Sequence, residues 1–234
     1  MSTSDSEARQ HVTSPVIVHH LNDSRSQRIL WLLEELEVPY ELKLYQRTPE
    51  RLAPKELLDV HPLGRAPVIT DGDVTLAESG ALVDYLIEKY GQGKISPSGE
   101  AKVTDLYFRH FAEGSFGPLV SNRYIYSLVP ERSPFFLRPI LRSVFSTLDA
   151  KLIDKPLTAA LDFIEGTFAK NGSWLAGGAE PTGADYMMSF LLEDLATRRP
   201  DLGPLTKAWI ERIHARPAYK RGLEKGGEYA YARP

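Results

Sequence analysis

Three short segments of this sequence carry side chains whose type and position could do chemistry. Ser24 follows the apolar run at 15–21, where a helix is predicted to begin. Pro67 opens another apolar run, and Glu78 and Ser79 open a pattern with helical spacing. The first and third segments therefore place polar side chains directly after a short strand, and the second begins a strand with proline.

Pro67 can adopt a cis peptide bond at little cost, because a proline amide has only a weak trans preference. A cis turn would leave the backbone of Ala66 facing outward, where it could pair with an extended peptide ligand. The alternative is a proline that only opens an edge strand and binds nothing.

Glu78 and Ser79 stand at a predicted helix N-terminus, which presents free N–H groups and partial positive charge. Such a place can bind a carboxylate with the Ser79 hydroxyl as a further donor, and Glu78 can hold an ammonium. Together they suit the head group of an α-amino acid, although a simple helix cap is the alternative. Ser24 could likewise donate a hydrogen bond to an anion or cap its helix, with Asn22 and Arg25 as competitors.

Composition excludes several kinds of chemistry. The chain has no cysteine, so it has no disulfide, no thiolate metal ligand and no cysteine nucleophile. Its six histidines show no zinc spacing, and we expect no metal site. The net charge of −3 gives no basic field for nucleic acid or an anionic membrane, and no apolar run approaches the length of a membrane span. The polar segment 1–14 contains acids and predicts a disordered tail rather than a signal peptide.

The 234 residues suffice for two domains. The first, at 15–92, shows strands at 15–21 and 40–46 around a helix that Pro39 ends, then helical turns at 54–61, a hairpin around 71–73 and a helix at 78–90. This order predicts an α/β thioredoxin-like domain. A linker rich in Gly, Ser and Pro covers 93–99, and an all-α domain follows at 100–234, with helices at 101–116, 133–153, 156–170, 181–196 and 204–216.

The segments "SRSQRILWLLEEL", "HPLGRAPVITDGDVTLAESGALVDYL" and "PTGADYMMSFLLE" resemble the cytosolic glutathione transferases, above all microbial members of a serine-type-like branch. The resemblance runs from about 16 to about 216. It implies that Glu78 and Ser79 hold the γ-glutamyl end of glutathione and that the Ala66 backbone pairs with its cysteinyl residue. It also implies a polar contact from Arg65 and a contact from Arg51 to the glycyl carboxylate. In the second domain, Thr182 to Asp185 match the capping box of the family, a structural feature.

The resemblance also suggests how the thiol is activated. Relatives use Tyr, Ser or Cys after the first strand, and Ser24 lies four residues before Arg28, as in serine-type members. Asn22 is the alternative. A hydrogen bond from Ser24 and the helix dipole would favour the thiolate, the form that attacks. Tyr107 and Phe111, four apart on one predicted helix, could line an electrophile pocket or simply pack in the core.

We therefore expect a glutathione transferase that joins the glutathione thiolate to small hydrophobic electrophiles. The resemblance implies a cytoplasmic homodimer with a detoxifying role, with glutathione as co-substrate and with no metal, nucleic acid or membrane span. One alternative is another reaction at the same site: peroxide reduction, disulfide reduction or ether cleavage. A second is a non-catalytic member that binds ligands or regulates.

Overall fold

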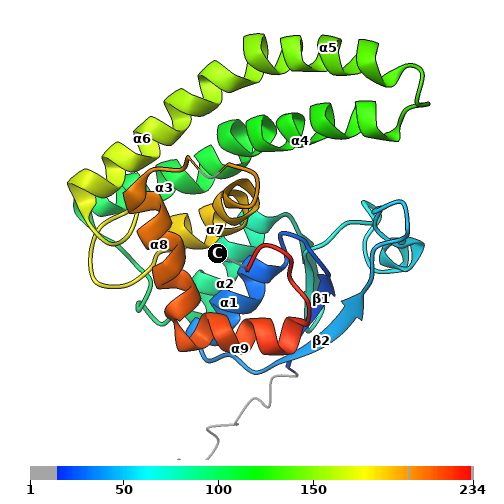
Figure 1. Ribbon diagram of the computed structural model, residues 1–234. Coiled ribbons are helices and arrows are strands. Elements are labelled where there is room, and N and C mark those ends of the chain that lie inside the picture. Colours follow the sequence, from blue (N-terminus) through cyan, green and yellow to red (C-terminus); the bar gives the residue numbers. More distant parts are fainter. Residues whose placement is uncertain (1–14, 200, 233–234) are drawn as a thin grey trace, which may run out of the picture.

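The computed structural model describes residues 15–199 and 201–232, arranged as a small sheet domain and a larger helical domain (Figure 1). The predicted tail at 1–14 lies outside the described residues. The sheet has the strand order β2-β1-β3-β4. This topology confirms the predicted thioredoxin-like domain.

Strand pairing follows the predicted order of elements. β1 (Val16–Leu21) and β2 (Tyr40–Tyr45) run parallel, because α1 (Gln27–Glu35) forms the crossover between them. β3 (Val68–Asp71) and β4 (Val74–Ala77) form an antiparallel hairpin, with Gly72 at a φ of 60° in its turn. β3 also pairs antiparallel with β1, and α2 (Ser79–Tyr90) follows β4 directly. Pro54 leads into one short 3-10 helix, η1 (Lys55–Asp59), where helical turns were predicted.

Nine α-helices lie in the described part of the chain, seven of them in the second domain. These seven are α3 (Gly99–Phe111), α4 (Gly117–Arg132), α5 (Arg138–Leu148), α6 (Lys155–Asn171), α7 (Gly183–Ala196), α8 (Pro204–Ala215) and α9 (Pro217–Gly226). π-helical segments at Ala112–Phe116 and Asp149–Asp154 join α3 to α4 and α5 to α6. In Figure 1, α4 and α5 form a long hairpin beside the body of the protein.

Two of these helices, α4 and α9, were not predicted. The sequence of α4 contains glycine and two prolines, and its apolar residues follow no single face, so it lacks the helical pattern. α9 begins with Pro217 directly after α8, and its apolar positions are few. Tertiary packing stabilises both helices, because α4 lies against α5 and α9 lies against α1.

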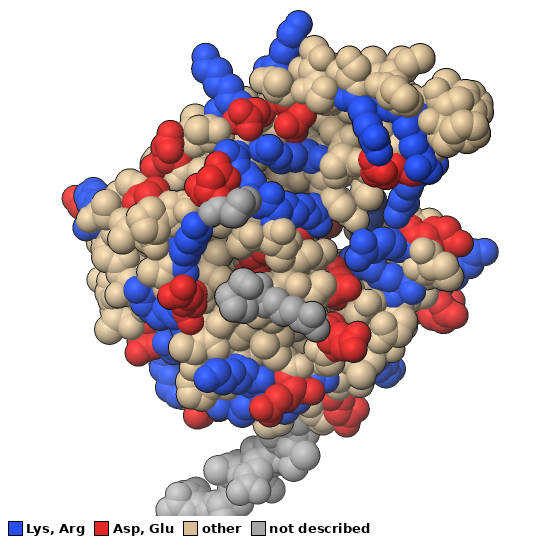
Figure 2. All heavy atoms as spheres, viewed as in Figure 1, with Lys and Arg blue, Asp and Glu red and all other residues tan. Residues whose placement is uncertain are grey.

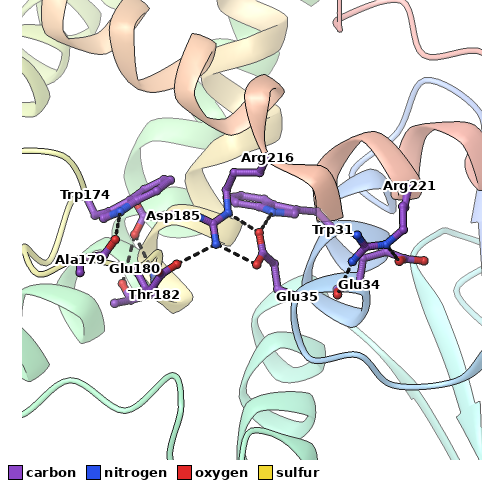
Figure 3. A network of polar contacts seen from close by, with 10 residues as sticks. All are labelled: Trp31, Glu34, Glu35, Trp174, Ala179, Glu180, Thr182, Asp185, Arg216 and Arg221. Atoms are coloured by element: carbon purple, nitrogen blue, oxygen red, sulfur yellow. Dashed lines mark hydrogen bonds and ion pairs between the residues drawn. The ribbon is translucent and has the colours of Figure 1, made fainter.

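α1 is buried between the two domains. From Gln27 to Glu34 every residue is buried, because α2, α7 and α9 cover the sides that the sheet leaves open. Polar contacts fasten the helix at its C-terminal end (Figure 3): Glu35 accepts hydrogen bonds from Arg216 and from the Trp31 indole, and Glu34 accepts one from Arg221. These bonds hold the C-terminal end of α1 against α9 and the residue that precedes it.

The capping box of α7 is confirmed. Asp185 is fully buried, and its carboxylate accepts hydrogen bonds from the Thr182 N–H at 2.9 Å and the Trp209 indole at 2.8 Å. Burial raises the pKa of Asp185 to about 6, against the effect of these donors. None of the helices in the described ranges is long and apolar enough to cross a membrane.

Candidate functional site

The three segments singled out in the sequence meet at one end of the sheet. β3 pairs with β1 at Val68 and His19, and with β4 at Val68 and Ala77. The residues just before Val68 therefore lie between the end of β1 and the start of α2. This register places Ala66 at the end of the sheet where both Ser24 and Ser79 follow their strands.

The Ala66–Pro67 peptide bond is cis, which agrees with the expectation for a proline at the start of this strand. Proline has no backbone N–H, so the ladder between β3 and β1 does not continue past Val68. The last residue of β1 extends beyond this ladder, and its backbone groups on that side need other partners.

A cleft of about 450 Å³ opens at this end of the sheet, between the two domains. Ser24, Arg51, Arg65 and Ala66 all line it. Further lining residues come from both domains: Leu21, Asp23, Arg25, Arg47, Leu52, Ala53, Ser121, Tyr124, Phe190, Asp194, Arg198 and Tyr231. In Figure 2 the blue basic side chains gather where the loop after β2 faces the α4–α5 hairpin. The cleft therefore combines a hydroxyl, several guanidinium groups and aromatic rings.

Ser24 lies in the turn that joins β1 to α1 and is 4% exposed. Its hydroxyl donates a hydrogen bond to the Leu21 carbonyl at 2.8 Å and accepts one from the Ser26 N–H at 3.1 Å. The N-cap of α1 is Ser26, so the expectation that Ser24 caps this helix is wrong. Ser24 instead closes the preceding turn, where its carbonyl accepts from the Gln27 N–H at 3.3 Å.

Asn22 forms hydrogen bonds to the end of β2 and to the residues that follow it. Its side-chain oxygen accepts a hydrogen bond from the Arg47 N–H at 2.8 Å, and its own N–H donates to the Tyr45 carbonyl at 3.2 Å. These bonds fasten the end of β1 to the end of β2. Asn22 does not belong to the described residues that line the cleft, whereas Ser24 does.

Arg47 was missed in the sequence, although an arginine directly after a predicted strand could have drawn attention to it. Its guanidinium donates to the backbone carbonyls of Asn22 at 3.2 Å, Arg51 at 3.1 Å and Asp23 at 3.0 Å. These three acceptors are neutral carbonyls. They hold the guanidinium in the wall of the cleft without neutralising its positive charge. Arg51 itself has a φ of 65° in the same loop.

Glu78 and Ser79 lie at the start of α2. Glu78 is exposed and has a φ of 73°, in the left-handed region that few residues other than glycine adopt. Ser79 is buried and is the first residue of the helix. Neither lines the cleft itself, but both follow Ala77, which pairs with Val68 at the same end of the sheet. A left-handed non-glycine residue beside a binding cleft is typical of functional sites.

Tyr107 and Phe111 lie elsewhere. Their rings stack at 5.6 Å between centroids and pack against Phe163 of α6. Tyr107 lines a separate groove between α3 and α6, and neither ring belongs to the described lining of the interdomain cleft. Phe111 packs against the core, as the alternative has it, whereas Tyr107 is 49% exposed, so neither residue supports the predicted electrophile pocket in this cleft. The aromatic residues that do line the cleft are Tyr124, Phe190 and Tyr231, which no sequence motif singled out.

An ion-pair cluster joins the start of α1 to the helical domain. Glu113, in the π-helical segment, accepts hydrogen bonds from Arg25 and from Arg28, each at 2.7 Å. The Arg28 side chain is completely buried, and burial lowers its pKa while the charge of Glu113 opposes this effect. The cluster holds Arg25 against the cleft beside Ser24.

Within residues 15–199 and 201–232, no group of three or more His, Asp or Glu side chains is arranged to hold a metal ion. The donor set of the cleft is instead suited to an organic anion, because hydroxyl and guanidinium groups predominate.

Comparison with known proteins agrees with this architecture. The family model "Glutathione S-transferase, N-terminal domain" matches residues 15–88, and "Glutathione S-transferase, C-terminal domain" matches residues 137–217. Glutathione S-transferase 3 of Schizosaccharomyces pombe is 34% identical over 218 residues, which cover 90% of this chain and 87% of the relative. Glutathione S-transferase 1 of Saccharomyces cerevisiae is 32% identical over 224 residues, which cover 90% and 95%.

A solved structure of a glutathione S-transferase from Actinobacillus pleuropneumoniae has a TM-score of 0.73 and 28% identity, with 93% of this chain and 96% of that chain covered. The fold, the family models and the yeast relatives together confirm the predicted family. The chain belongs to the glutathione S-transferases and is an enzyme of that family.

Proposed function

We propose that the enzyme joins the thiolate of glutathione to small hydrophobic electrophiles in the cleft between its domains, and that Ser24 stabilises the thiolate. The observation that carries the proposal is the meeting of Ser24 and Ala66 in one cleft, at the end of the sheet where α2 begins. A tripeptide that extends from α2 past Ala66 has its central residue next to the turn that contains Ser24.

Each end of glutathione then has a partner of suitable charge. The γ-glutamyl end carries an ammonium for Glu78 and a carboxylate for the Ser79 hydroxyl and the N-terminus of α2. The glycyl carboxylate fits the guanidinium groups of Arg47 and Arg51, and Arg65, which lines the same cleft, supplies a further polar contact. The Ala66 backbone pairs with the cysteinyl residue, as in recognition of an extended peptide.

Thiolate formation needs only modest assistance. A free thiol has a pKa of about 8.5, and a decrease of two units corresponds to about 2.7 kcal/mol. A charge-assisted hydrogen bond from Ser24 and the N-terminal end of α1 together supply about this amount. The thiolate then attacks an electrophile held against Tyr124, Phe190 and Tyr231, the aromatic residues of the helical wall.

The test of thiol activation is the absorbance of bound thiolate as a function of pH in Ser24→Ala and Asn22→Ala. We expect Ser24→Ala to raise the pKa of bound glutathione, and turnover of an aryl halide at neutral pH to fall about tenfold for each 1.4 kcal/mol lost. Glutathione affinity should change little, because the contacts to both ends of the tripeptide remain. A shift in Asn22→Ala alone would assign activation to the amide instead.

The test of glutathione recognition is Ser79→Ala, measured by calorimetry. We expect the variant to weaken glutathione binding by about 1.5–3 kcal/mol, the contribution of a hydrogen bond to a charged group. An unchanged affinity in a folded variant would contradict the assignment of the γ-glutamyl end. Turnover assays with aryl halides, hydroperoxides and mixed disulfides would separate conjugation from the other reactions open to this site.

We also propose a cytoplasmic homodimer with a role in detoxification, which rests on the family likeness. Sedimentation of the purified enzyme at micromolar concentration tests the dimer, and a single species with the mass of one chain would contradict it.

A further inference from the structure

The carboxyl end of β1 relies on two serine side chains for its backbone hydrogen bonds. Leu21 lies beyond the last pair of the β1–β3 ladder, and Pro67 has no N–H to extend that ladder. Instead, the Leu21 N–H donates to the Ser26 hydroxyl at 3.2 Å, and the Leu21 carbonyl accepts from the Ser24 hydroxyl at 2.8 Å. The hydroxyl assigned to the thiolate is therefore already used by the backbone.

The Ser26 hydroxyl connects Ser24 to a buried histidine. It lies 2.7 Å from the Ser24 hydroxyl and 2.9 Å from Nδ1 of His20. Ser24, Ser26 and His20 are 4%, 0% and 2% exposed, so water does not compete for these bonds. Burial lowers the pKa of His20 to about 4, although a hydrogen bond to the backbone of Gly226 in α9 acts in the opposite direction. The imidazole is accordingly neutral at pH 7.

The number of protons limits what the two serines can do. Each hydroxyl has a single proton to donate. When the Ser24 proton turns to the sulfur of glutathione, the buried Leu21 carbonyl loses its 2.8 Å hydrogen bond, and an unpaired buried carbonyl is unfavourable. Within the described chain, the other side-chain donor bonded to this carbonyl is the Ser26 hydroxyl, at 3.1 Å.

We propose that Ser26 is a positioning residue whose hydroxyl takes over the bond to the Leu21 carbonyl and so frees the Ser24 proton for the glutathione thiolate. In the free enzyme the Ser26 hydroxyl donates its hydrogen bond to Nδ1 of His20, and the imidazole carries its own proton at Nε2. In the glutathione complex the Ser26 hydroxyl turns to the carbonyl, and the neutral imidazole keeps its proton at Nε2, beside the backbone of Gly226. The net charge of the site does not change. This inference rests on the proposed role of Ser24.

The experiment compares four variants: Ser24→Ala, Ser26→Ala, Ser26→Thr and the control Ser189→Ala. Ser189 is 2% exposed, and its hydroxyl donates to the Tyr186 carbonyl within α7, so its replacement removes a buried hydroxyl outside the cleft lining. For each variant, the absorbance of glutathione thiolate is measured against pH, with glutathione affinity and aryl-halide turnover at neutral pH.

We expect Ser26→Ala to raise the pKa of bound glutathione by about one unit and to lower kcat by about tenfold, because the Ser24 proton then stays on the Leu21 carbonyl. Glutathione affinity should stay within about twofold of the wild type, since this residue binds neither end of the tripeptide. Ser26→Thr keeps a hydroxyl and should restore the pKa, and Ser189→Ala should not change it. The charged and titratable groups that line the cleft are the same in all variants: Asp23, Arg25, Arg47, Arg51, Arg65, Tyr124, Asp194, Arg198 and Tyr231.

The outcomes separate this inference from the proposed function. If Ser24→Ala raises the pKa and Ser26→Ala does not, the positioning role is overturned and the role of Ser24 stands. If neither variant shifts the pKa, both fail. Should Ser26→Ala not fold, His20→Phe removes the competing acceptor and should leave the pKa of bound glutathione equal or lower. A higher pKa in folded His20→Phe would overturn the exchange.

Discussion

Glu113→Gln should destabilise the protein far more than the loss of an ordinary surface ion pair. Glu113 is the shared partner of Arg25 and Arg28, at 2.7 Å from each. The Arg28 side chain is 0% exposed, and its Nε and Nη2 atoms have no hydrogen-bond partner. A neutral amide at position 113 therefore leaves a buried guanidinium without its counter-charge, at the interface that holds the start of α1.

The magnitude follows from the burial of the pair. At 2.7 Å and an effective dielectric constant of about 20, the attraction between Arg28 and Glu113 is about 6 kcal/mol. The desolvation of both ions offsets a large part of it, and removal of one partner of a buried pair costs about 3–5 kcal/mol. Because the Glu113 side chain is 30% exposed, we take the lower end and expect a loss of about 3 kcal/mol in the free energy of unfolding.

The assay is urea denaturation at pH 7, with Glu131→Gln as the matched control. Glu131 pairs with Arg142 at 2.8 Å, but the two side chains are 54% and 59% exposed, so its replacement should cost less than about 1 kcal/mol. A second substitution, Arg28→Met in the Glu113→Gln background, removes the unpaired charge and should recover part of the loss. Equal unfolding free energies for Glu113→Gln and Glu131→Gln would refute this account of the interface.

Two further predictions concern buried titratable groups. Because the folded-state pKa of His20 is lowered from 6.5 to about 4, the folded protein binds this proton less tightly than the unfolded chain. The contribution of neutral His20 to the free energy of unfolding should be fully present above pH 6.5 and should be lost, by up to about 3 kcal/mol, as the pH falls through 4. His20→Phe should flatten this pH dependence in a series of urea denaturations. Parallel curves for the variant and the wild type would contradict the prediction. Asp185→Asn should lower the free energy of unfolding by about 3–5 kcal/mol at pH 7, because the NH₂ group of asparagine would face a donor: the backbone N–H of Thr182 or Leu175, or the Trp209 indole. A loss of less than about 1 kcal/mol in urea denaturation would contradict this prediction and show that the site relaxes.

The sequence by itself was enough for the family, the order of elements in the first domain and the capping box of α7. These features are local: alternation marks a strand, a proline and a turn mark its ends, and Thr182 and Asp185 lie within one helical turn. The junctions at Ser24, Ala66 and Ser79 were also accessible, because each closes or opens an element whose pattern is clear. Their roles toward glutathione stay predictions.

Only the tertiary structure decided which residues complete the cleft. Tyr107 and Phe111 have the spacing of a helix face, but spacing alone does not say which neighbour that face meets, and it meets α6. Tyr124 belongs to a helix without an amphipathic pattern, and Tyr231 reaches the cleft from the chain segment after α9. Such positions depend on contacts between distant parts of the chain.

The hydrogen bonds of Ser24 also combine a feature that the sequence predicts with one that depends on the tertiary structure. The sequence placed a hydroxyl after β1, but its partners depend on where β3 stops pairing, which the register of a strand far along the chain decides. The competition that we propose between the Leu21 carbonyl and a bound sulfur for the Ser24 proton therefore depends on the fold, because β3 leaves this carbonyl without a ladder partner.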